Sequence, residues 1–192
     1  PKLDETVRAI HILRNPRDIL LSALNYHKLT TKLEGSTPDK PYAQGFLNSL
    51  GDPDWKRVGY GSWASHTRSW MNTDRFPVLT LRYEQLREDP ERELSRALEF
   101  LEFDRSPDEI SRAVKASSFD QMRALEIREK NSFKSASEKK RLFIGSKKVT
   151  RKGIFFMNKG KSNQSLDTIE PGLDARFDKA FGADLAELGY SS

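Results

Sequence analysis

Arg14 and Ser22 lie eight positions apart, around a turn that reads Arg-Asn-Pro. An arginine at the end of a strand can hold a phosphate through two parallel hydrogen bonds, because its guanidinium is a planar fork of N–H donors. The N-terminus of a following helix adds amide donors and a favourable dipole. The same residues also allow a local ion pair between Arg14 and Asp18. The spacing alone therefore leaves a phosphate site and an ion pair as alternatives.

The segments on either side of this turn predict a strand followed by a helix. Residues 7–13 form a short apolar run with β-branched side chains, which is typical of a strand buried in a parallel sheet. Asn15 is a suitable N-cap, and Pro16 suits the first helical position, where its missing amide hydrogen costs nothing. We therefore expect the strand end and the helix N-terminus to face the same anion.

The rest of the chain predicts further helices, a second strand and one domain over residues 1–192. Residues 31–59 lack sustained periodicity, apart from a possible short helix at 42–50, and are expected to be a surface excursion. The other expected elements are a helix at 61–72, a strand at 78–83, helices starting at Asp89-Pro90 and at the capping box Ser106-Pro107-Asp108-Glu109, and a closing helix with Phe177, Phe181, Leu185 and Leu188.

Composition excludes several classes of protein and points to an anionic ligand. The 192 residues contain no cysteine, which excludes disulfides and thiolate metal sites and fits a reducing compartment, so we expect the cytoplasm. No apolar run approaches the roughly 20 residues that span a bilayer. Residues 128–161 hold twelve Lys or Arg against two Glu, within a net charge of +5 for the whole chain. This basic stretch indicates an anionic partner, with a plain solvated loop as the alternative.

Several short motifs, taken in order, resemble the cytosolic and bacterial sulfotransferases that use 3′-phosphoadenosine 5′-phosphosulfate. The Arg14–Ser22 spacing resembles the family's 3′-phosphate signature. The other matching stretches are Gly61-Ser62-Trp63 with His66 and Trp70, Leu81 to Glu84, and Ser117-Ser118-Phe119 with Met122. The resemblance implies that Arg14 and Ser22 hold the 3′-phosphate, and that Tyr83, Ser117 and Phe119 approach the adenine.

The family closes its nucleotide site with an Arg-Lys-Gly tripeptide, and two registers compete for it here. Arg151-Lys152-Gly153 matches the letters, but Asn158-Lys159-Gly160 has the right distance to the closing helix, so we favour the second. It places Asn158 where the family has arginine, which implies a weaker grip on the phosphate, with Lys159 and the Gly160 amide remaining as donors. Arg151 and Lys152 are possible replacements for the missing charge. Residues 130–152 are expected to be a mobile lid that orders over the nucleotide.

The resemblance implies an α/β, P-loop-like sulfotransferase fold, a parallel sheet flanked by helices, with its N-terminal part missing. The family's 5′-phosphosulfate loop and catalytic histidine precede the first strand, so no catalytic residue is assigned. His11, His27 and His66 are interpreted as structural. The implied reaction moves a sulfuryl group to a hydroxyl or amine of a small-molecule acceptor, without a metal. The competing hypotheses are a non-catalytic nucleotide-binding scaffold and a nucleic-acid-binding module; the acceptor and the oligomeric state stay open.

Overall fold

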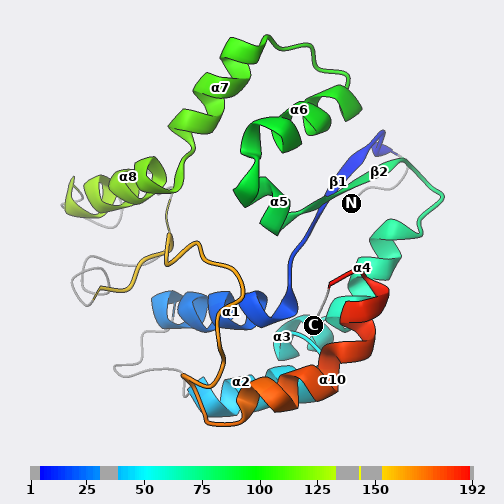
Figure 1. Cartoon of the computed structure of the whole chain (residues 1–192), viewed down its shortest axis with the longest axis vertical. Helices are drawn as coiled ribbons and strands as arrows, with labels where there is room; N and C mark the ends of the chain where they lie inside the picture. The colour runs from blue at the N-terminus through cyan, green and yellow to red at the C-terminus, as the bar shows by residue number, and fades with distance from the viewer. Residues whose placement is uncertain (1–4, 31–38, 133–142, 144–152, 191–192) are drawn as a thin grey trace.

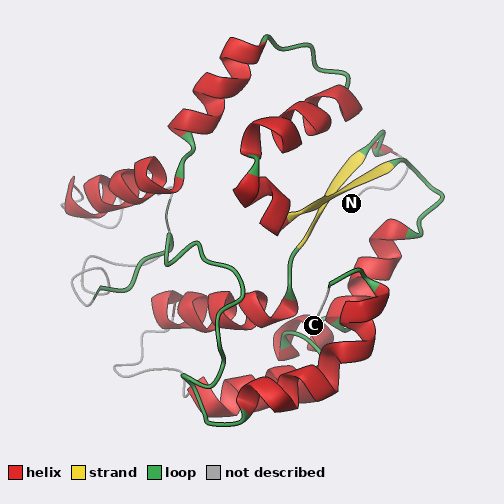
Figure 2. Cartoon of the chain, viewed as in Figure 1, coloured by secondary structure: helices red, strands yellow, loops and turns green. Residues whose placement is uncertain are grey.

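The computed structural model describes residues 5–30, 39–132, 143 and 153–190. Strands β1 (Ala9–Leu13) and β2 (Val78–Arg82) form a parallel pair whose register runs from Ala9 opposite Val78 to Leu13 opposite Arg82 (Figure 2). Both strands were expected, and both are slightly shorter than the apolar runs that predicted them. The pair places the carboxyl ends of β1 and β2 side by side, so the turns that follow them start from one edge.

Helices make up most of the described chain, and several of them pack against the strand pair (Figure 1). The path from α5 through α6 and α7 to α8 forms an arc on one side, and α10 lies beside α2 on the other (Figure 1). The helices are α1 (Pro16–Thr30), α2 (Asp39–Ser49), α3 (Pro53–Arg57), α4 (Trp63–Met71), α5 (Tyr83–Glu88), α6 (Pro90–Phe100), α7 (Pro107–Ala116), α8 (Phe119–Ser132) and α10 (Leu173–Glu187).

Local sequence signals set the starts of these helices. Helix α1 begins at Pro16 as predicted, and the Asn15 side chain accepts a hydrogen bond from the Arg17 amide at 2.9 Å. The capping box is present at α7, where Ser106 and Glu109 bond each other's backbone amides. The Asp89 side chain caps α6 in the same way, by accepting from the Arg92 amide. Each of these side chains satisfies an amide that the helix itself leaves unpaired.

A hydrophobic cluster lies between α1, α2 and α10, and it corrects one prediction. We expected residues 31–59 to be a surface excursion with a possible short helix at 42–50. The helix is present as α2, but its Ala43, Phe46 and Leu47 are buried in this cluster. Their spacing places them on one face of a short helix, and that face packs against Phe177 and Phe181 of α10. The segment that lacked a long periodic pattern therefore contributes to the core. Residues 31–38 lie outside the described part of the chain.

Two further boundaries differ from the predictions. The run at 78–83 was expected to be strand throughout, but the strand ends at Arg82 and Tyr83 opens α5. Helix α8 begins at Phe119, which the sequence presented only as a short motif. Side chains that pack against neighbouring elements decide such short helices, because propensity alone stabilises them weakly.

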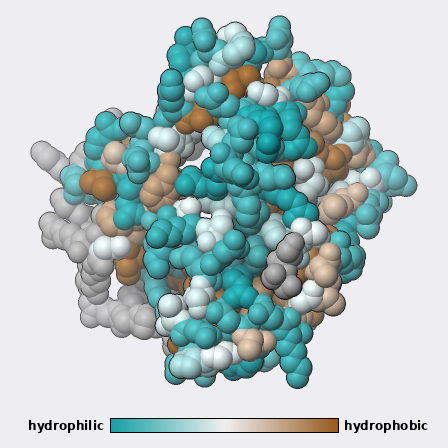
Figure 3. All heavy atoms as spheres, in the orientation of Figure 1, coloured by the Kyte–Doolittle hydropathy of each residue, from teal (hydrophilic) through white to brown (hydrophobic). Residues whose placement is uncertain are grey.

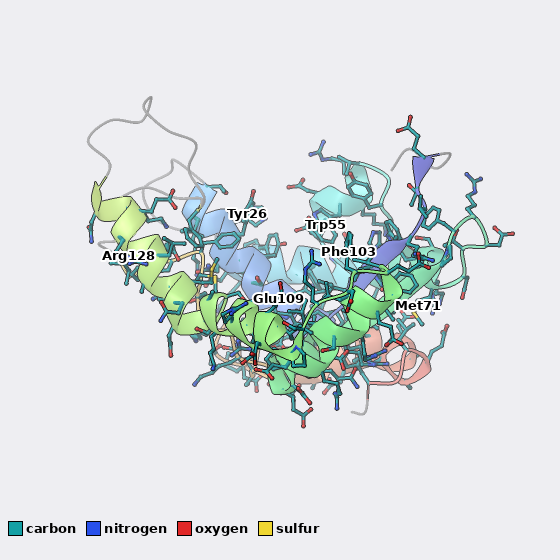
Figure 4. The ribbon with its side chains drawn as sticks, turned by 90° about the horizontal axis from the view of Figure 1, so that it is seen from above. Tyr26, Trp55, Met71, Phe103, Glu109 and Arg128 are labelled. Atoms are coloured by element: carbon teal, nitrogen blue, oxygen red, sulfur yellow. The ribbon has the colours of Figure 1, made fainter. Side chains whose placement is uncertain are left out.

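Large apolar side chains that remain exposed are spread over several elements. Tyr26 on α1, Trp55 on α3, Met71 at the end of α4 and Phe103 after α6 are examples (Figure 4). Hydrophilic side chains predominate on the face of the molecule shown in Figure 3. Scattered exposed apolar residues are ordinary for a protein surface. In the described residues, no helix is long and apolar enough to cross a bilayer.

His11 and His66 share an aromatic cluster with Trp70 behind the strand pair. The His11 ring is stacked on Trp70 at 6.1 Å between centroids, and Trp70 Nε1 donates to His66 Nε2 at 3.1 Å. Burial lowers the pKa of both imidazoles, and the neighbouring His66 lowers the pKa of His11 further. The fold therefore holds both rings in the neutral form, which fits the structural role expected from the sequence.

This cluster predicts that acid destabilises the fold. A histidine whose pKa is lowered on folding contributes stability above its unfolded pKa of about 6.5 and loses it as the pH falls below that value. We expect the melting temperature to fall between pH 7.5 and pH 5.5, and His11→Phe, which keeps a ring against Trp70, to reduce that fall. Thermal melts monitored by circular dichroism test this. His27→Phe on α1 is the control; an equal reduction in both variants would contradict the prediction.

Candidate functional site

A pocket of about 460 Å³ opens beside the carboxyl ends of the two strands. Its walls come from α1, the start of α5, the junction between α7 and α8, and the segment before α10. All of the predicted site residues line this one pocket: Arg14, Ser22, Tyr83, Ser117, Phe119, Asn158, Lys159 and Gly160. Residues separated by more than a hundred positions in the sequence therefore meet at one place.

The turn that carries Arg14 is held by side chains from three distant elements. The Arg14 carbonyl accepts a hydrogen bond from Trp63 Nε1 at 3.1 Å, and the Asn15 amide donates to Glu84 Oε1 at 3.1 Å. The other carboxylate oxygen of Glu84 accepts from the Tyr190 hydroxyl at 3.2 Å. The backbone at the end of β1 is thus fixed by α4, α5 and the C-terminal region before any ligand binds.

The Arg14 side chain lines the pocket, and it forms no ion pair with any residue that the structure describes. Its guanidinium carbon lies 4.1 Å from the centroid of the Tyr83 ring, and its Nε is buried without a hydrogen-bond partner. Within the described residues it forms no ion pair with Asp18, so the competing interpretation of the turn is not what the structure contains. The Asp18 carboxylate instead accepts hydrogen bonds from the backbone amides of Asn163 and Gln164. Arg14 is therefore free to bind an anion from solution.

Asp18 is an acidic residue in a pocket that is lined mainly by basic side chains. Burial raises the pKa of its carboxyl group. The hydrogen bonds from the Asn163 and Gln164 backbone amides and the positive charge of Arg14 lower this pKa. Five basic side chains line the pocket against two acidic ones: Arg14, Lys28, Arg87, Lys159 and Lys161 against Asp18 and Asp39. The balance favours an anionic ligand.

Most of residues 153–164 line the pocket, and this stretch presents backbone donors that have no partner among the described residues. In the described chain, the amides of residues 159–162 donate to no protein acceptor. Lys159, Gly160 and Lys161 all line the pocket, and neither lysine forms an ion pair with a described residue. Consecutive free amides beside basic side chains are a suitable arrangement for a phosphate.

Of the two registers considered for the closing tripeptide, only the favoured one can be followed completely. Asn158, Lys159 and Gly160 line the pocket. Gly153 also lines it, but Arg151 and Lys152 lie outside the described residues, as does almost all of the expected lid at 130–152. Their proposed roles stay predictions.

Several pocket residues were not predicted from the sequence: Asn25, Lys28, Arg87, Phe156, Met157 and Lys161. Asn25 and Lys28 follow Ser22 at helical spacing, so the periodicity of α1 was a signal that could have identified them. Phe156 and Met157 precede Asn158 directly, and no local pattern distinguishes them from core residues. His66 lies in the aromatic cluster and does not line the pocket.

A family model described as "Sulfotransferase domain" matches residues 2–189 of this chain. The chain belongs to this sulfotransferase family. Sulfotransferase 1A1 from Mus musculus is 34% identical over 122 residues, which are 63% of this chain and 40% of that protein. Sulfotransferase 1A1 from Rattus norvegicus is 28% identical over 189 residues, which are 98% of this chain and 59% of that protein. The chain therefore spans about half the length of these relatives.

Solved structures show the same fold. The mouse sulfotransferase SULT7A1 complexed with PAP matches with a TM-score of 0.64 and 23% identity, over 93% of this chain and 58% of that one. Retinol dehydratase in a complex with retinol and PAP matches with a TM-score of 0.67 and 20% identity, over 100% of this chain and 51% of that one. The expected family and the α/β sulfotransferase fold are confirmed.

Gly160 is a point at which the pocket tolerates little change. It has a φ of +59°, and a Cβ placed on it would lie 2.8 Å from a carbon of the Phe119 ring. We expect Gly160→Ala to displace Phe119 and to weaken binding of the ligand proposed below, adenosine 3′,5′-bisphosphate, about tenfold, the effect of roughly 1.4 kcal/mol of strain. Calorimetry measures this. Gly153→Ala is the control, because its Cβ would meet nothing within 4 Å although its φ is also positive; equal losses would contradict the contact with Phe119.

Proposed function

We propose that this chain forms the nucleotide-binding side of a sulfotransferase that takes its sulfuryl group from 3′-phosphoadenosine 5′-phosphosulfate. The observation that carries the proposal is the single pocket lined by Arg14, Ser22, Tyr83, Phe119 and Lys159 together. Chance clustering of the sequence motifs does not explain why their side chains line one cavity. The family membership and the PAP complexes of the structural neighbours support the same ligand.

In this proposal, the phosphate and the base occupy different parts of the pocket. Arg14, Ser22 and Lys159, with the Gly160 amide, hold the 3′-phosphate, while Asn158 contributes no charge at its position. Arginine is suited to this role because it binds phosphate with two hydrogen bonds at once. Phe119 and Tyr83 offer aromatic surface to the adenine, and Ser117 lies beside them. Stacking on an aromatic ring is favourable for any base.

Sulfuryl transfer breaks the bond between the sulfur and the bridging oxygen of the 5′-phosphosulfate and forms a bond from sulfur to an acceptor oxygen or nitrogen. The acceptor loses a proton, and adenosine 3′,5′-bisphosphate leaves. Orientation of the donor and cationic stabilisation of the charge on the leaving phosphate lower the barrier in reactions of this kind. The described pocket residues provide the orientation. We assign none of them to the proton transfer or to the 5′-phosphosulfate.

The acceptor is proposed to be a hydroxyl or amine of a small molecule. One relative is named an amine sulfotransferase, from Oryctolagus cuniculus, at 25% identity over 182 residues, which are 94% of this chain and 55% of that protein. A cytoplasmic location is proposed because the chain has no cysteine and is similar to proteins of this family. The net charge of +5 gives the alternative, a nucleic-acid-binding module, only weak support.

Isothermal titration calorimetry on residues 1–192 tests the ligand. We expect adenosine 3′,5′-bisphosphate to bind at least tenfold more tightly than adenosine 5′-monophosphate, because a phosphate held by charged donors gains about 1.5–3 kcal/mol. A single-stranded oligonucleotide is the third titrant. Equal affinity for the two nucleotides would overturn the assignment of the 3′-phosphate, and a preference for the oligonucleotide would favour the binding module.

We also expect residues 1–192 to bind the donor without transferring its sulfuryl group. The reason is that none of the assigned residues contacts the 5′-phosphosulfate or accepts the acceptor's proton, and orientation alone leaves most of the barrier in place. An assay with labelled donor and a panel of phenols, alcohols and amines measures this. Turnover that disappears in Arg14→Ala would show that catalytic groups lie within these residues and that the assignment above is incomplete.

A further inference from the structure

The pocket wall at residues 155–164, which we call the wall segment, forms neither helix nor strand. Four of its backbone amides instead donate hydrogen bonds to side chains of other elements, and such bonds can fix the shape of an irregular segment. The segment carries Asn158, Lys159 and Gly160, so its shape decides where these residues stand in the pocket. Contacts at both of its ends show how it is held.

Glu126 of α8 holds the beginning of the wall segment. One carboxylate oxygen accepts the Phe156 amide at 2.7 Å, and the other accepts the Met157 amide at 2.9 Å. Glu126 is fully buried and is ion-paired with Lys130, one helical turn away. Arg123, from the same helix, donates to the carbonyls of Met157 and Asn158.

Asp18 of α1 holds the end of the wall segment in the same way. Its Oδ2 accepts the Asn163 amide at 3.1 Å, and its Oδ1 accepts the Gln164 amide at 3.4 Å. Asp18 is only 1% exposed, so these amides are its main compensation for lost water. Nothing in the pocket proposal requires a negative charge at this place, which makes another role for Asp18 necessary.

We propose that Asp18 and Glu126 are positioning residues, a pair of buried carboxylates that clamp the two ends of the wall segment in its ligand-binding shape. A carboxylate is suited to this role because it presents two acceptor oxygens and no donor, so it can receive two neighbouring amides at once. Between the clamps, the amides of residues 159–162 are left free for the ligand. This inference rests on the proposed function only for the identity of the ligand.

The clamp can be tested by hydrogen exchange in the wild-type chain, without any ligand. Amide hydrogen exchange followed by nuclear magnetic resonance should show slow exchange at Phe156, Met157, Asn163 and Gln164, and fast exchange at residues 159–162, within one irregular segment. Fast exchange at all of these amides would overturn the clamp, and this measurement does not depend on whether a variant folds.

Amide-for-carboxylate variants test each end separately. We expect Asp18→Asn to speed exchange at Asn163 and Gln164 at least tenfold, since an amide group offers one acceptor oxygen and directs its NH₂ at the second amide. Glu126→Gln should do the same at Phe156 and Met157 only. Acceleration spread evenly over the whole segment would mean general destabilisation and would contradict two separate clamps.

Ligand affinity then connects the clamps to the pocket. We expect both variants to bind adenosine 3′,5′-bisphosphate about tenfold more weakly, and Glu93→Gln to bind it as the wild type does. Glu93 is a matched control because it is 1% exposed and paired with Arg92 and Arg96 on α6, away from the wall segment. Unchanged affinity in both clamp variants would overturn the positioning role. A wild-type chain with the expected exchange pattern that binds no nucleotide would support the clamp and overturn the proposed function instead.

Discussion

Arg14→Ala should weaken the binding of adenosine 3′,5′-bisphosphate by roughly 10- to 100-fold, corresponding to about 1.5–3 kcal/mol for a hydrogen bond to a charged group. The reason is that the buried Nε of Arg14 has no hydrogen-bond partner in the described part of the chain, and that Arg14 lines the pocket beside Tyr83. Calorimetry with the wild type and the variant measures the ratio of dissociation constants. The loss should shrink at high salt, since ions screen the attraction between guanidinium and phosphate.

Two controls separate this effect from a general change in charge. Arg105→Ala removes an equal charge from an exposed arginine that donates a hydrogen bond to the neighbouring Asp104 carbonyl, and it should leave the affinity unchanged. Adenosine 5′-monophosphate, which lacks the 3′-phosphate, should bind the wild type and Arg14→Ala almost equally. An equal loss for both nucleotides would move Arg14 away from the 3′-phosphate.

Phe181→Ala should destabilise the fold by about 3–5 kcal/mol, which is the range for removing a buried aromatic ring. Phe181 is fully buried, with ring centroids of Phe177 at 4.5 Å, Phe46 at 5.9 Å and Trp63 at 6.4 Å. Urea unfolding followed by circular dichroism gives the change in the free energy of unfolding. A loss of this size is a large share of the stability of a typical domain.

The matched control for Phe181 is Phe103→Ala, because Phe103 is 55% exposed and should change stability by less than about 0.5 kcal/mol. The core variant should also affect the pocket. Trp63 contacts the Phe181 ring and donates to the Arg14 carbonyl, so the cavity left by Phe181 should loosen a side chain that fixes the turn at Arg14. A stability loss equal to that of Phe103→Ala would contradict the central place of Phe181 in the core.

Local signals in the sequence were sufficient for much of the fold. Pro16 and the capping box at Ser106 set helix starts, because the groups involved are neighbours in the chain and act independently of the tertiary structure. The β-branched runs that became β1 and β2 were predicted for the same reason. Helix α2 was underestimated, since its stability depends on burying Phe46 against α10, more than a hundred residues away.

The candidate site was also predicted only in part: its residues were identified from the sequence, but their contacts were not. Arg14, Ser22 and the Asn158-Lys159-Gly160 stretch were identified from residue type, spacing and a family resemblance, all of which are present in the linear sequence. What the sequence did not contain was their partners. Whether Arg14 pairs with Asp18 or stays free depends on where the backbone of Asn163 and Gln164 lies.

The sequence by itself thus determined the family, the strand–turn–helix unit and the chemistry of the residues proposed to bind phosphate, because residue type and short spacing are sufficient for each. Only the tertiary structure decided that Asp18 and Glu126 hold the wall segment, and that Trp63 and Glu84 fix the turn at Arg14. These contacts join residues 30 to 145 positions apart. Their energy depends on burial and on bond geometry, and neither quantity exists until the chain has folded.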